Sequence, residues 1–209
     1  MEIGESISPL NSQLPFYFKQ PNDSLIMDLF IADESFHRFA EHICDTIQDA
    51  AQKRGTGIAR RSPEYIKTKM TNGNAVIALD GDTFAGFCYI EVWGGKNFVA
   101  HSGLIIPEEY RGRGLAKAIK SKVLELSIQK YPEAKIFGIT TGSAVMKINY
   151  QLGYKPVTFN ELTDDPKFWD GCQTCLNYDI LTRTNRKMCL CTGMLYDNHL
   201  NQKIKNDEK

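Results

Sequence analysis

Two arginines and two glycines alternate over Arg111–Gly114, directly before a segment with helical periodicity. The first amides of a helix lack intrahelical acceptors and carry about half a positive charge, so they can hold an anion. Glycine lets backbone amides approach that anion, and arginine adds charge-assisted hydrogen bonds. An apolar run, Ser102–Ile106, precedes the turn. The order of strand, glycine-rich turn and helix therefore predicts a phosphate-binding turn; the alternative is a surface turn with solvated arginines.

Four of the six cysteines lie near the C-terminus, as a CxxC pair (Cys172 and Cys175) and a CxC pair (Cys189 and Cys191). If the CxC pair lies on a strand over Met188–Tyr196, both thiols face the same side. Four such thiols could form a tetrahedral structural zinc site, although CxC is not the spacing of a standard zinc ribbon. The alternative is a loop of reduced thiols packed over a strand, and a disulfide is disfavoured in a reducing compartment.

The composition limits the classes of function. The 209 residues are 42% hydrophobic, which suits one domain with appendages. Lysine plus arginine and aspartate plus glutamate number 25 each, so no nucleic-acid partner is expected and any anion site is local. No apolar run is long enough to span a membrane, and the acidic N-terminus, broken by prolines, is not a secretory signal. We therefore predict a cytoplasmic protein without a membrane partner.

Hydrophobic periodicity and the positions of capping and turn residues predict the elements that position the glycine-rich turn. Asp33 and Ser62 are candidate caps of two helices, Asp80-Gly81 is the signal of a tight hairpin, and Ser143 is expected to cap a later helix. The expected elements, in chain order, are a strand (25–32), two helices (33–54 and 63–72) and three antiparallel strands (74–80, 82–93 and 97–106). A helix (115–126), a strand (135–141), a helix (143–152) and two strands (154–159 and 188–196) follow.

This order, with the turn after the fourth strand, resembles the GNAT acyl-CoA N-acyltransferase superfamily. The motif of that family is arginine or glutamine, two residues, glycine, one residue, then glycine or alanine. It falls here on Arg111, Gly114 and Ala116, and the segment Asn149–Tyr154 resembles the second cofactor-contacting segment. The resemblance covers residues 25–160 and implies an α/β fold of the α+β type. Its mixed, mostly antiparallel sheet would have about seven strands flanked by about four helices.

Composition at the chain ends, together with the extent of the resemblance, predicts a domain organisation. Residues 1–24 are expected to be a flexible N-terminal extension, and 25–160 the acyltransferase core. Residues 161–200 would be a cysteine-containing extension with the last strand, and 201–209 a disordered tail.

The co-substrate implied by the resemblance is acetyl-CoA or another short acyl-CoA. Its diphosphate would lie at the glycine-rich turn and its pantetheine arm beside the strand Leu104–Ile106. A backbone amide near Ile105 or Ile106 would polarise the thioester carbonyl. The expected cofactor-binding residues are Leu104, Ile105, Ile106, Arg111, Gly112, Arg113, Gly114, Leu115, Ala116 and Asn149.

In this family the amine attacks the thioester directly, within a ternary complex. The candidates for the base that deprotonates the amine are Glu91 and His101, each with a purely structural alternative. The family commonly has a tyrosine acid four residues before the glycine that closes the second segment. Here that position is Asn149, and Tyr150 is displaced by one residue, about 100° around the helix. Tyr150 is therefore the candidate acid, and the thiolate could also leave without one.

A basic, glycine-loosened segment, Lys53–Ser62, borders the acceptor side of this fold. Guanidinium groups bind carboxylates in a planar, two-pronged way, so Arg54, Arg60 and Arg61 suit an acidic amino acid as the acceptor. The alternative is a solvated charged loop.

Three stretches, "FAGFCYIEVWG", "AVMKIN" and "TNRKMCLCTGMLYD", resemble the small GNAT proteins that act as N-acetylglutamate synthase in arginine biosynthesis. That resemblance implies acylation of the α-amine of glutamate, with an acetyl or succinyl group. A homodimer is one option for the assembly. The competing hypothesis is a non-catalytic acyl-CoA-binding regulatory module.

Overall fold

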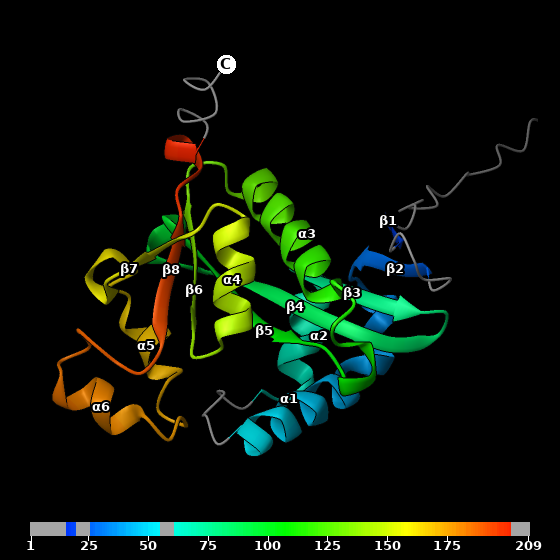
Figure 1. The fold of residues 1–209 in the computed structure, drawn as a ribbon, viewed down its shortest axis with the longest axis horizontal. Coiled ribbons are helices and arrows are strands. Elements are labelled where there is room, and N and C mark those ends of the chain that lie inside the picture. The colour runs from blue at the N-terminus through cyan, green and yellow to red at the C-terminus, as the bar shows by residue number, and fades with distance from the viewer. Residues whose placement is uncertain (1–15, 20–25, 55–60, 202–209) are drawn as a thin grey trace, which may run out of the picture.

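The computed structural model describes residues 16–19, 26–54 and 61–201 of the chain. Within these ranges eight strands form one sheet, in the order β1-β2-β3-β4-β5-β6-β8-β7 (Figure 1). Neighbouring strands are antiparallel, except that β5 and β6 are parallel. The strands are β1 (Phe16–Lys19), β2 (Ile26–Ile31), β3 (Ala75–Asp80), β4 (Thr83–Trp93), β5 (Phe98–Ile105), β6 (Lys135–Thr140), β7 (Lys155–Val157) and β8 (Thr192–Tyr196).

Helices cover both faces of the sheet. Residues of α1 and α2 pack on one face and residues of α3 and α4 on the other (Figure 1). The predicted α/β class with a mixed, mostly antiparallel sheet is thus confirmed. The α-helices in the described ranges are α1 (Ala40–Arg54), α2 (Pro63–Thr71), α3 (Leu115–Lys130), α4 (Ser143–Gln151), α5 (Pro166–Asp170) and α6 (Tyr178–Arg183).

Capping residues set the starts of the first helical segments. The Asp33 carboxylate accepts a hydrogen bond from the Ser35 amide (2.9 Å) and starts a 3₁₀ turn that leads into α1. The Ser62 hydroxyl accepts one from the Tyr65 amide at the start of α2 (3.2 Å). The cap predicted at Ser143 is wrong: Ser143 is the first residue of α4, and Gly142 holds the cap position without a side-chain hydrogen bond.

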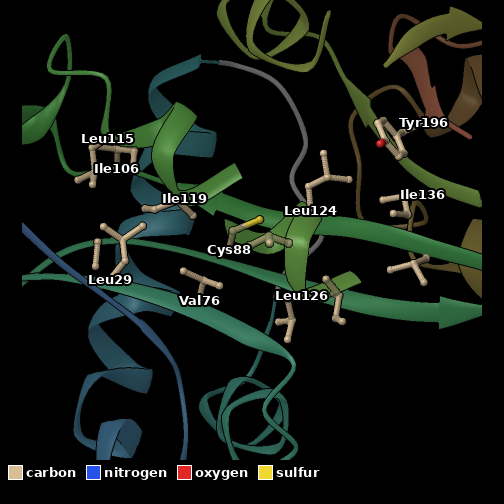
Figure 2. Packing of buried hydrophobic residues seen from close by; sticks show 14 of the residues in the cluster. Leu29, Val76, Cys88, Ile106, Leu115, Ile119, Leu124, Leu126, Ile136 and Tyr196 are labelled. Atoms are coloured by element: carbon tan, nitrogen blue, oxygen red, sulfur yellow. The ribbon is translucent and has the colours of Figure 1, made fainter. Parts of the chain in front are cut away.

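Burial against the sheet fixes the position of α3. Leu115 and Ile119 point from this helix into a cluster that contains Val76 of β3 and Cys88 of β4 (Figure 2). Both helix residues are at most 1% exposed. Each fully buried aliphatic side chain contributes roughly 1.5–3 kcal/mol, so the first turn of α3 is held firmly over the sheet.

Strands β5 and β6 separate after a short paired stretch. Their pairing joins Phe98–Ala100 to Lys135–Phe137 and does not extend beyond Ala100 and Phe137. The later residues of β5 pair with β4, and the later residues of β6 pair with β8. The backbone edges of two adjacent strands thus face each other without a shared hydrogen-bond ladder, which opens the centre of the sheet.

The last strand is shorter than predicted. It was expected over 188–196, but β8 begins at Thr192, where pairing with Thr140 starts. Cys189 and Cys191 therefore precede the strand, and the argument that placed both thiols on one strand face is wrong. Between β7 and β8 lie two short helices that the sequence did not predict, α5 and α6. They pack in a third apolar cluster around Phe137, Phe159 and Trp169.

The chain ends differ in part from the expectation. The extension expected over 1–24 contains β1, whose four residues pair antiparallel with β2. Pairing with a neighbouring strand orders a segment that has no apolar period of its own. The rest of that extension, and residues 202–209 of the expected tail, lie outside the described residues. In the part of the chain that is described, no helix has the length and apolar character that crossing a membrane requires.

Candidate active site

A cavity of about 560 Å³ lies where β5 and β6 separate. Its wall includes His101–Leu104 of β5 and Gly138–Thr140 of β6. Tyr65 of α2 lines it from one face of the sheet, and Asn149 of α4 lines it from the other. The separation of the two strands therefore forms a passage through the sheet, in which two reactants can meet from opposite faces.

A β-bulge shapes the β5 wall of this cavity. On β4, Phe87 and Tyr89 are two residues apart, but their partners on β5, Ile105 and Ser102, are three apart. The extra residue is accommodated at Gly103, whose φ is +64°. A Cβ on Gly103 would overlap the ring of Tyr89, so only glycine fits there. The bulge redirects the backbone of the strand end toward the cavity.

The predicted oxyanion amides lie just beyond this bulge. Leu104 lines the cavity, whereas the Ile105 and Ile106 side chains are buried in the clusters on opposite faces of the sheet. Burial of these two side chains fixes their backbone. An amide held in this way can stabilise a developing oxyanion without reorganising.

The glycine-rich turn leads into α3 with two left-handed residues. Gly112 has a φ of +76° and Gly114, the cap residue, a φ of +78°. No heavy atom lies within 4 Å of a Cβ placed on Gly112, so its positive φ, and not a lack of space, is what favours glycine there. The buried Leu115 and half-buried Ala116 side chains anchor the helix. The Lys117 amide already donates to the Gly114 carbonyl (3.0 Å), whereas the Leu115 and Ala116 amides have no backbone acceptor among the described residues. The predicted anion site has the backbone conformation that such a site needs.

Arg111 is tied into this turn. Its Nε donates a hydrogen bond to the Ile106 carbonyl (3.0 Å), and its guanidinium lies 3.6 Å from Glu108. About half of its side chain, 48%, remains exposed. Arg111 thus connects the end of β5 to the turn while keeping donors free for a phosphate, and the half-buried Arg113 lies two residues further on.

Glu91 lies at the centre of a polar network on the α2 face of the cavity. It is 6% exposed and lines the cavity. The Tyr65 hydroxyl donates to one carboxylate oxygen, and the Ser102 hydroxyl donates to the other (2.7 Å). Arg61 and Lys69 each lie 4.0 Å from the carboxylate. Buried carboxylates are stable when they are hydrogen-bonded and paired in this way.

The two phenols beside Glu91, Tyr65 and Tyr89, keep their protons at neutral pH. Burial, and then the Glu91 charge, raise the pKa of the Tyr65 phenol. Burial, and then Glu91, raise the pKa of Tyr89, whose hydroxyl accepts a hydrogen bond from Arg61 Nε (2.6 Å). Burial lowers the pKa of Lys69. At neutral pH the phenols are donors, so the carboxylate is the group in this network that can accept a proton.

His101 lies on the opposite face of the sheet. Its Nε2 is 2.9 Å from the Ser127 hydroxyl, which itself donates to the Val123 carbonyl (2.8 Å). The hydroxyl must therefore accept from Nε2–H, which leaves Nδ1 as the acceptor. Nδ1 is approached by the Lys120 ammonium (2.9 Å) and the Tyr154 hydroxyl (3.0 Å). Burial, and then Lys120, hold the pKa of His101 well below its usual value.

The two residues at the predicted acid position have opposite environments. Asn149 is buried, lines the cavity, and its Oδ1 has no hydrogen-bond partner among the described residues. Tyr150 is 70% exposed and does not line the cavity. The rotation of one residue around α4 turns Tyr150 toward solvent, so we assign it no part in the chemistry.

The three arginines of the predicted acceptor segment are not equally described. Arg61 lines the cavity beside Tyr89 and Glu91. Arg54 is the last residue of α1, and its side chain lies outside the described residues, as does all of Arg60. Lys167, at the start of α5, also lines the cavity. The cavity wall thus contains the carboxylate of Glu91 and the cationic side chains of Arg61, Lys120 and Lys167.

The four C-terminal cysteines come together beside the cavity. All four border a small apolar pocket under α6, and all four are free. Burial is the main cause that raises the pKa of Cys172 to about 11 and of Cys191 to about 12. The described residues contain no group of three or more histidine, cysteine, aspartate or glutamate side chains placed to hold a metal ion. The predicted structural zinc therefore has no support, and the thiols pack here as small apolar side chains.

Several residues of the site were missed by the sequence reasoning. Tyr65, Tyr89, Ser102 and Lys120 line the cavity, but their types and spacing look like ordinary core or surface positions. The bulge at Gly103 could have been predicted, because an isolated glycine inside a strand pattern often marks a bulge.

Comparisons with known proteins identify the family and the fold of the chain. The sequence profile of the acetyltransferase (GNAT) family matches residues 38–143. No curated protein matches the chain. Among solved structures, N-acetylglutamate synthase from Neisseria gonorrhoeae, complexed with coenzyme A and N-acetyl-glutamate, is similar with a TM-score of 0.61 at 12% identity. The match covers 85% of this chain and only 36% of that synthase.

Two further structures match most of their own length. A Mycobacterium tuberculosis protein in complex with coenzyme A has a TM-score of 0.59 at 12% identity, over 81% of this chain and 98% of that one. Diaminobutyrate acetyltransferase from Paenibacillus lautus, in complex with its substrate and coenzyme A, has a TM-score of 0.52 at 11% identity, over 67% and 87% of the two chains. At such identities the likeness establishes the fold alone.

Proposed function

Because the chain belongs to the acetyltransferase (GNAT) family and is an acyl-CoA-dependent N-acyltransferase, we propose that it acylates the α-amine of an acidic amino acid, glutamate above all. The single observation that carries this proposal is the charge pattern of the cavity. One buried carboxylate, Glu91, lies beside Arg61 in a wall that also holds Lys167. An acidic amino acid has one ammonium and two carboxylates, which complements this arrangement.

The proposed chemistry uses the two faces of the cavity. The acceptor enters on the α2 face, where its ammonium pairs with Glu91 and its carboxylates with Arg61. Glu91 takes a proton from the ammonium, and the free amine attacks the thioester carbonyl. A backbone amide at the end of β5, beyond Gly103, stabilises the oxyanion.

The acyl-CoA enters on the α3 face. Its diphosphate lies against the first amides of α3, held by Arg111 and Arg113, and its pantetheine arm runs along the unpaired part of β5 toward the passage. The wall at Leu104 and Asn149 contacts that arm. The similarity to structures that contain coenzyme A supports this placement.

The biological setting follows from the acceptor. With glutamate and acetyl-CoA the product is N-acetylglutamate, which would place the reaction in arginine biosynthesis, in the cytoplasm. The resemblance to small synthases of that pathway supports this assignment, as does the fold shared with the Neisseria gonorrhoeae enzyme. Succinyl as the acyl group and a homodimeric assembly belong to the same proposal.

The test is an acceptor panel. The purified protein is mixed with acetyl-CoA or succinyl-CoA and with glutamate, glutamine, leucine or diaminobutyrate, and free thiol release and product mass are measured. Glutamate and glutamine are matched in shape and differ in side-chain charge. We expect glutamate to give the higher kcat/KM. A neutral or basic acceptor that is preferred would contradict the acidic-acceptor proposal, and tight coenzyme A binding without turnover on any amine would favour a binding module.

The charges of the turn should control coenzyme A affinity. Replacing Arg111 and Arg113 together by glutamate should raise the Kd for coenzyme A at least tenfold, about 1.4 kcal/mol, because two phosphate-binding cations become anions. Isothermal titration measures this. The control, Lys155→Glu with Lys187→Glu, makes the same change in net charge at exposed positions elsewhere. Equal effects of the two double variants would mean that the phosphates bind elsewhere.

Replacing Asn149 by leucine should stabilise the fold but weaken the binding of coenzyme A. Its buried Oδ1 lacks a partner in the described structure, so Asn149→Leu should raise the free energy of unfolding by roughly 1 kcal/mol. The same variant removes a hydrogen-bond acceptor for pantetheine and should raise the Kd for coenzyme A about fivefold, within the range for one hydrogen bond. Urea unfolding and calorimetry test both, with the exposed Asn160→Leu as the control. Unchanged affinity would remove Asn149 from the cofactor site.

A further inference from the structure

Lys120 is a buried cation on the α3 face of the cavity. It lies in the second turn of α3 and is 3% exposed, and it lines the cavity between β5 and β6. Lysine is almost never fully buried without an ionic partner, because removing an ammonium from water is costly. Its position therefore calls for an explanation.

No carboxylate neutralises this charge within the described residues. The ion pairs found there do not include Lys120. Its Nζ donates to His101 Nδ1 (2.9 Å) and lies 5.1 Å from the centre of the Tyr154 ring. Cys88 of β4 is the other titratable group that acts on it, and burial raises the pKa of that thiol to about 11. The neighbours are thus neutral groups, which leave the positive charge uncompensated.

The hydrogen bonds around His101 place the positive charge on Lys120 and leave the imidazole neutral. Because Ser127 occupies Nε2–H, the imidazole presents only the acceptor Nδ1 to Lys120. Burial lowers the pKa of Lys120 to about 8, so the ammonium is mostly charged at neutral pH but can give up its proton. The neutral imidazole orients the ammonium without pairing with it.

Lys120 is close to the end of the passage. His101, which it contacts, directly follows the last pair that joins β5 to β6, at Ala100 and Phe137. Along α3, Lys120 is six residues after Gly114, about 9 Å in a helix with a rise of 1.5 Å per residue. A pantetheine arm that starts at the first amides of α3 and follows β5 is long enough to reach this point.

Acyl transfer from a thioester creates two negative charges, an oxyanion and then a thiolate. The amides beyond the β5 bulge are placed for the oxyanion. We propose that Lys120 is the further catalytic residue of the α3 face: its ammonium faces the thioester sulfur, stabilises the departing thiolate and protonates it. This role would fill the position that an exposed Tyr150 leaves open. The inference rests on acyl transfer from coenzyme A and not on the identity of the acceptor.

The step balances as follows. When the tetrahedral intermediate collapses, the C–S bond breaks and its electron pair goes to sulfur. Lys120 Nζ gives its proton to that sulfur, which yields the free thiol of coenzyme A and a neutral amine on Lys120. The nitrogen of the new amide loses its second proton to solvent water as the intermediate collapses. Glu91 then releases its proton to solvent and Lys120 takes one up, so each turnover frees one proton.

Kinetics of Lys120→Met test this role with acetyl-CoA and the best acceptor. Methionine keeps most of the length of the lysine side chain, and the Tyr154 hydroxyl can donate to His101 Nδ1 in place of Lys120, so folding should persist, as circular dichroism would verify. We expect kcat at pH 7 to fall at least tenfold with little change in the KM for acetyl-CoA. In the wild type kcat should fall as pH rises through about 8, because the ammonium loses its proton, and this decline should be absent in the variant. The control is Lys122→Met on the same helix.

A second readout does not require turnover. The thiol of bound coenzyme A is titrated by thiolate absorbance, with the desulfo-coenzyme A complex as the blank. We expect the thiolate to form at lower pH in the wild type than in Lys120→Met, because the ammonium stabilises it. Identical titrations in both proteins would overturn the proposal even if no acceptor has been found. A loss of kcat only with acyl groups that carry a carboxylate would also overturn it, since Lys120 would then bind the acyl group.

Discussion

Replacing Glu91 by glutamine should lower kcat/KM for the acceptor at least about 100-fold, the usual contribution of a positioned general base. The substitution keeps the shape of the side chain and an oxygen that can accept from Tyr65 or Ser102. It removes the charge that pairs with the acceptor ammonium and the site that takes its proton. Because Glu91 lies on the α2 face, the Kd for coenzyme A should not change. Steady-state kinetics and calorimetry measure the two quantities.

The control for this change is Glu125→Gln, which neutralises an exposed carboxylate on α3. The rival base, His101, lies on the other face of the sheet, with its Nε2 engaged by Ser127. A loss of less than tenfold in Glu91→Gln, together with complete loss in His101→Gln, would move the base to the α3 face and contradict the proposed roles.

Replacing Gly103 by alanine should both destabilise the protein and inactivate it. An alanine at a φ of +64° costs roughly 1–2 kcal/mol, and overlap with a buried ring adds roughly 1–3 kcal/mol. We therefore expect the free energy of unfolding to fall by about 2–5 kcal/mol, measured by urea denaturation. The Tyr89 ring is 1% exposed and cannot move into solvent, so the β5 backbone must shift instead. Amides that shift lose their alignment with the oxyanion, and kcat should fall at least tenfold.

Gly95→Ala is a matched control for this variant. Gly95 has the same φ of +64°, but no heavy atom lies within 4 Å of a Cβ placed there. The control should lose only about 1–2 kcal/mol, the cost of the backbone conformation, and keep its activity. If both variants lost the same stability and both stayed active, neither the contact with Tyr89 nor the bulge would matter for catalysis.

Local signals in the sequence predicted the order of the elements from β2 to β7 and the glycine-rich turn before α3. The conformation of this turn can be predicted because it depends on the local backbone. Two glycines before a helix specify that conformation over four residues. The caps at Asp33 and Ser62 and the hairpin after Asp80 can be predicted from the sequence for the same reason. Each is a contact between residues close together in the chain.

The polar network was not predictable in the same way. Glu91 and His101 were equal candidates because alternation along β4 and β5 cannot say which face each takes. The pairing of Ile90 with His101 and the bulge at Gly103 decide this, and register across strands is a long-range property. Tyr65 reaches Glu91 from another element, 26 residues away in the sequence. Contacts of this kind follow from packing and leave no local pattern.

The cysteine segment shows the same limit. The zinc hypothesis assumed that the strand begins at Met188, but pairing with β6 starts only at Thr192. The helices α5 and α6 are short and are stabilised by packing around Trp169 and Leu181. Short helices have little intrinsic stability, so propensity alone does not predict them.

A crystal structure with acetyl-CoA and glutamate would test these assignments most directly. We expect diphosphate oxygens on the amides of Gly112–Leu115, the thioester in the passage between β5 and β6, and the glutamate ammonium beside Glu91. Acetyl-CoA bound away from the first turn of α3, or a thioester outside the passage, would contradict them.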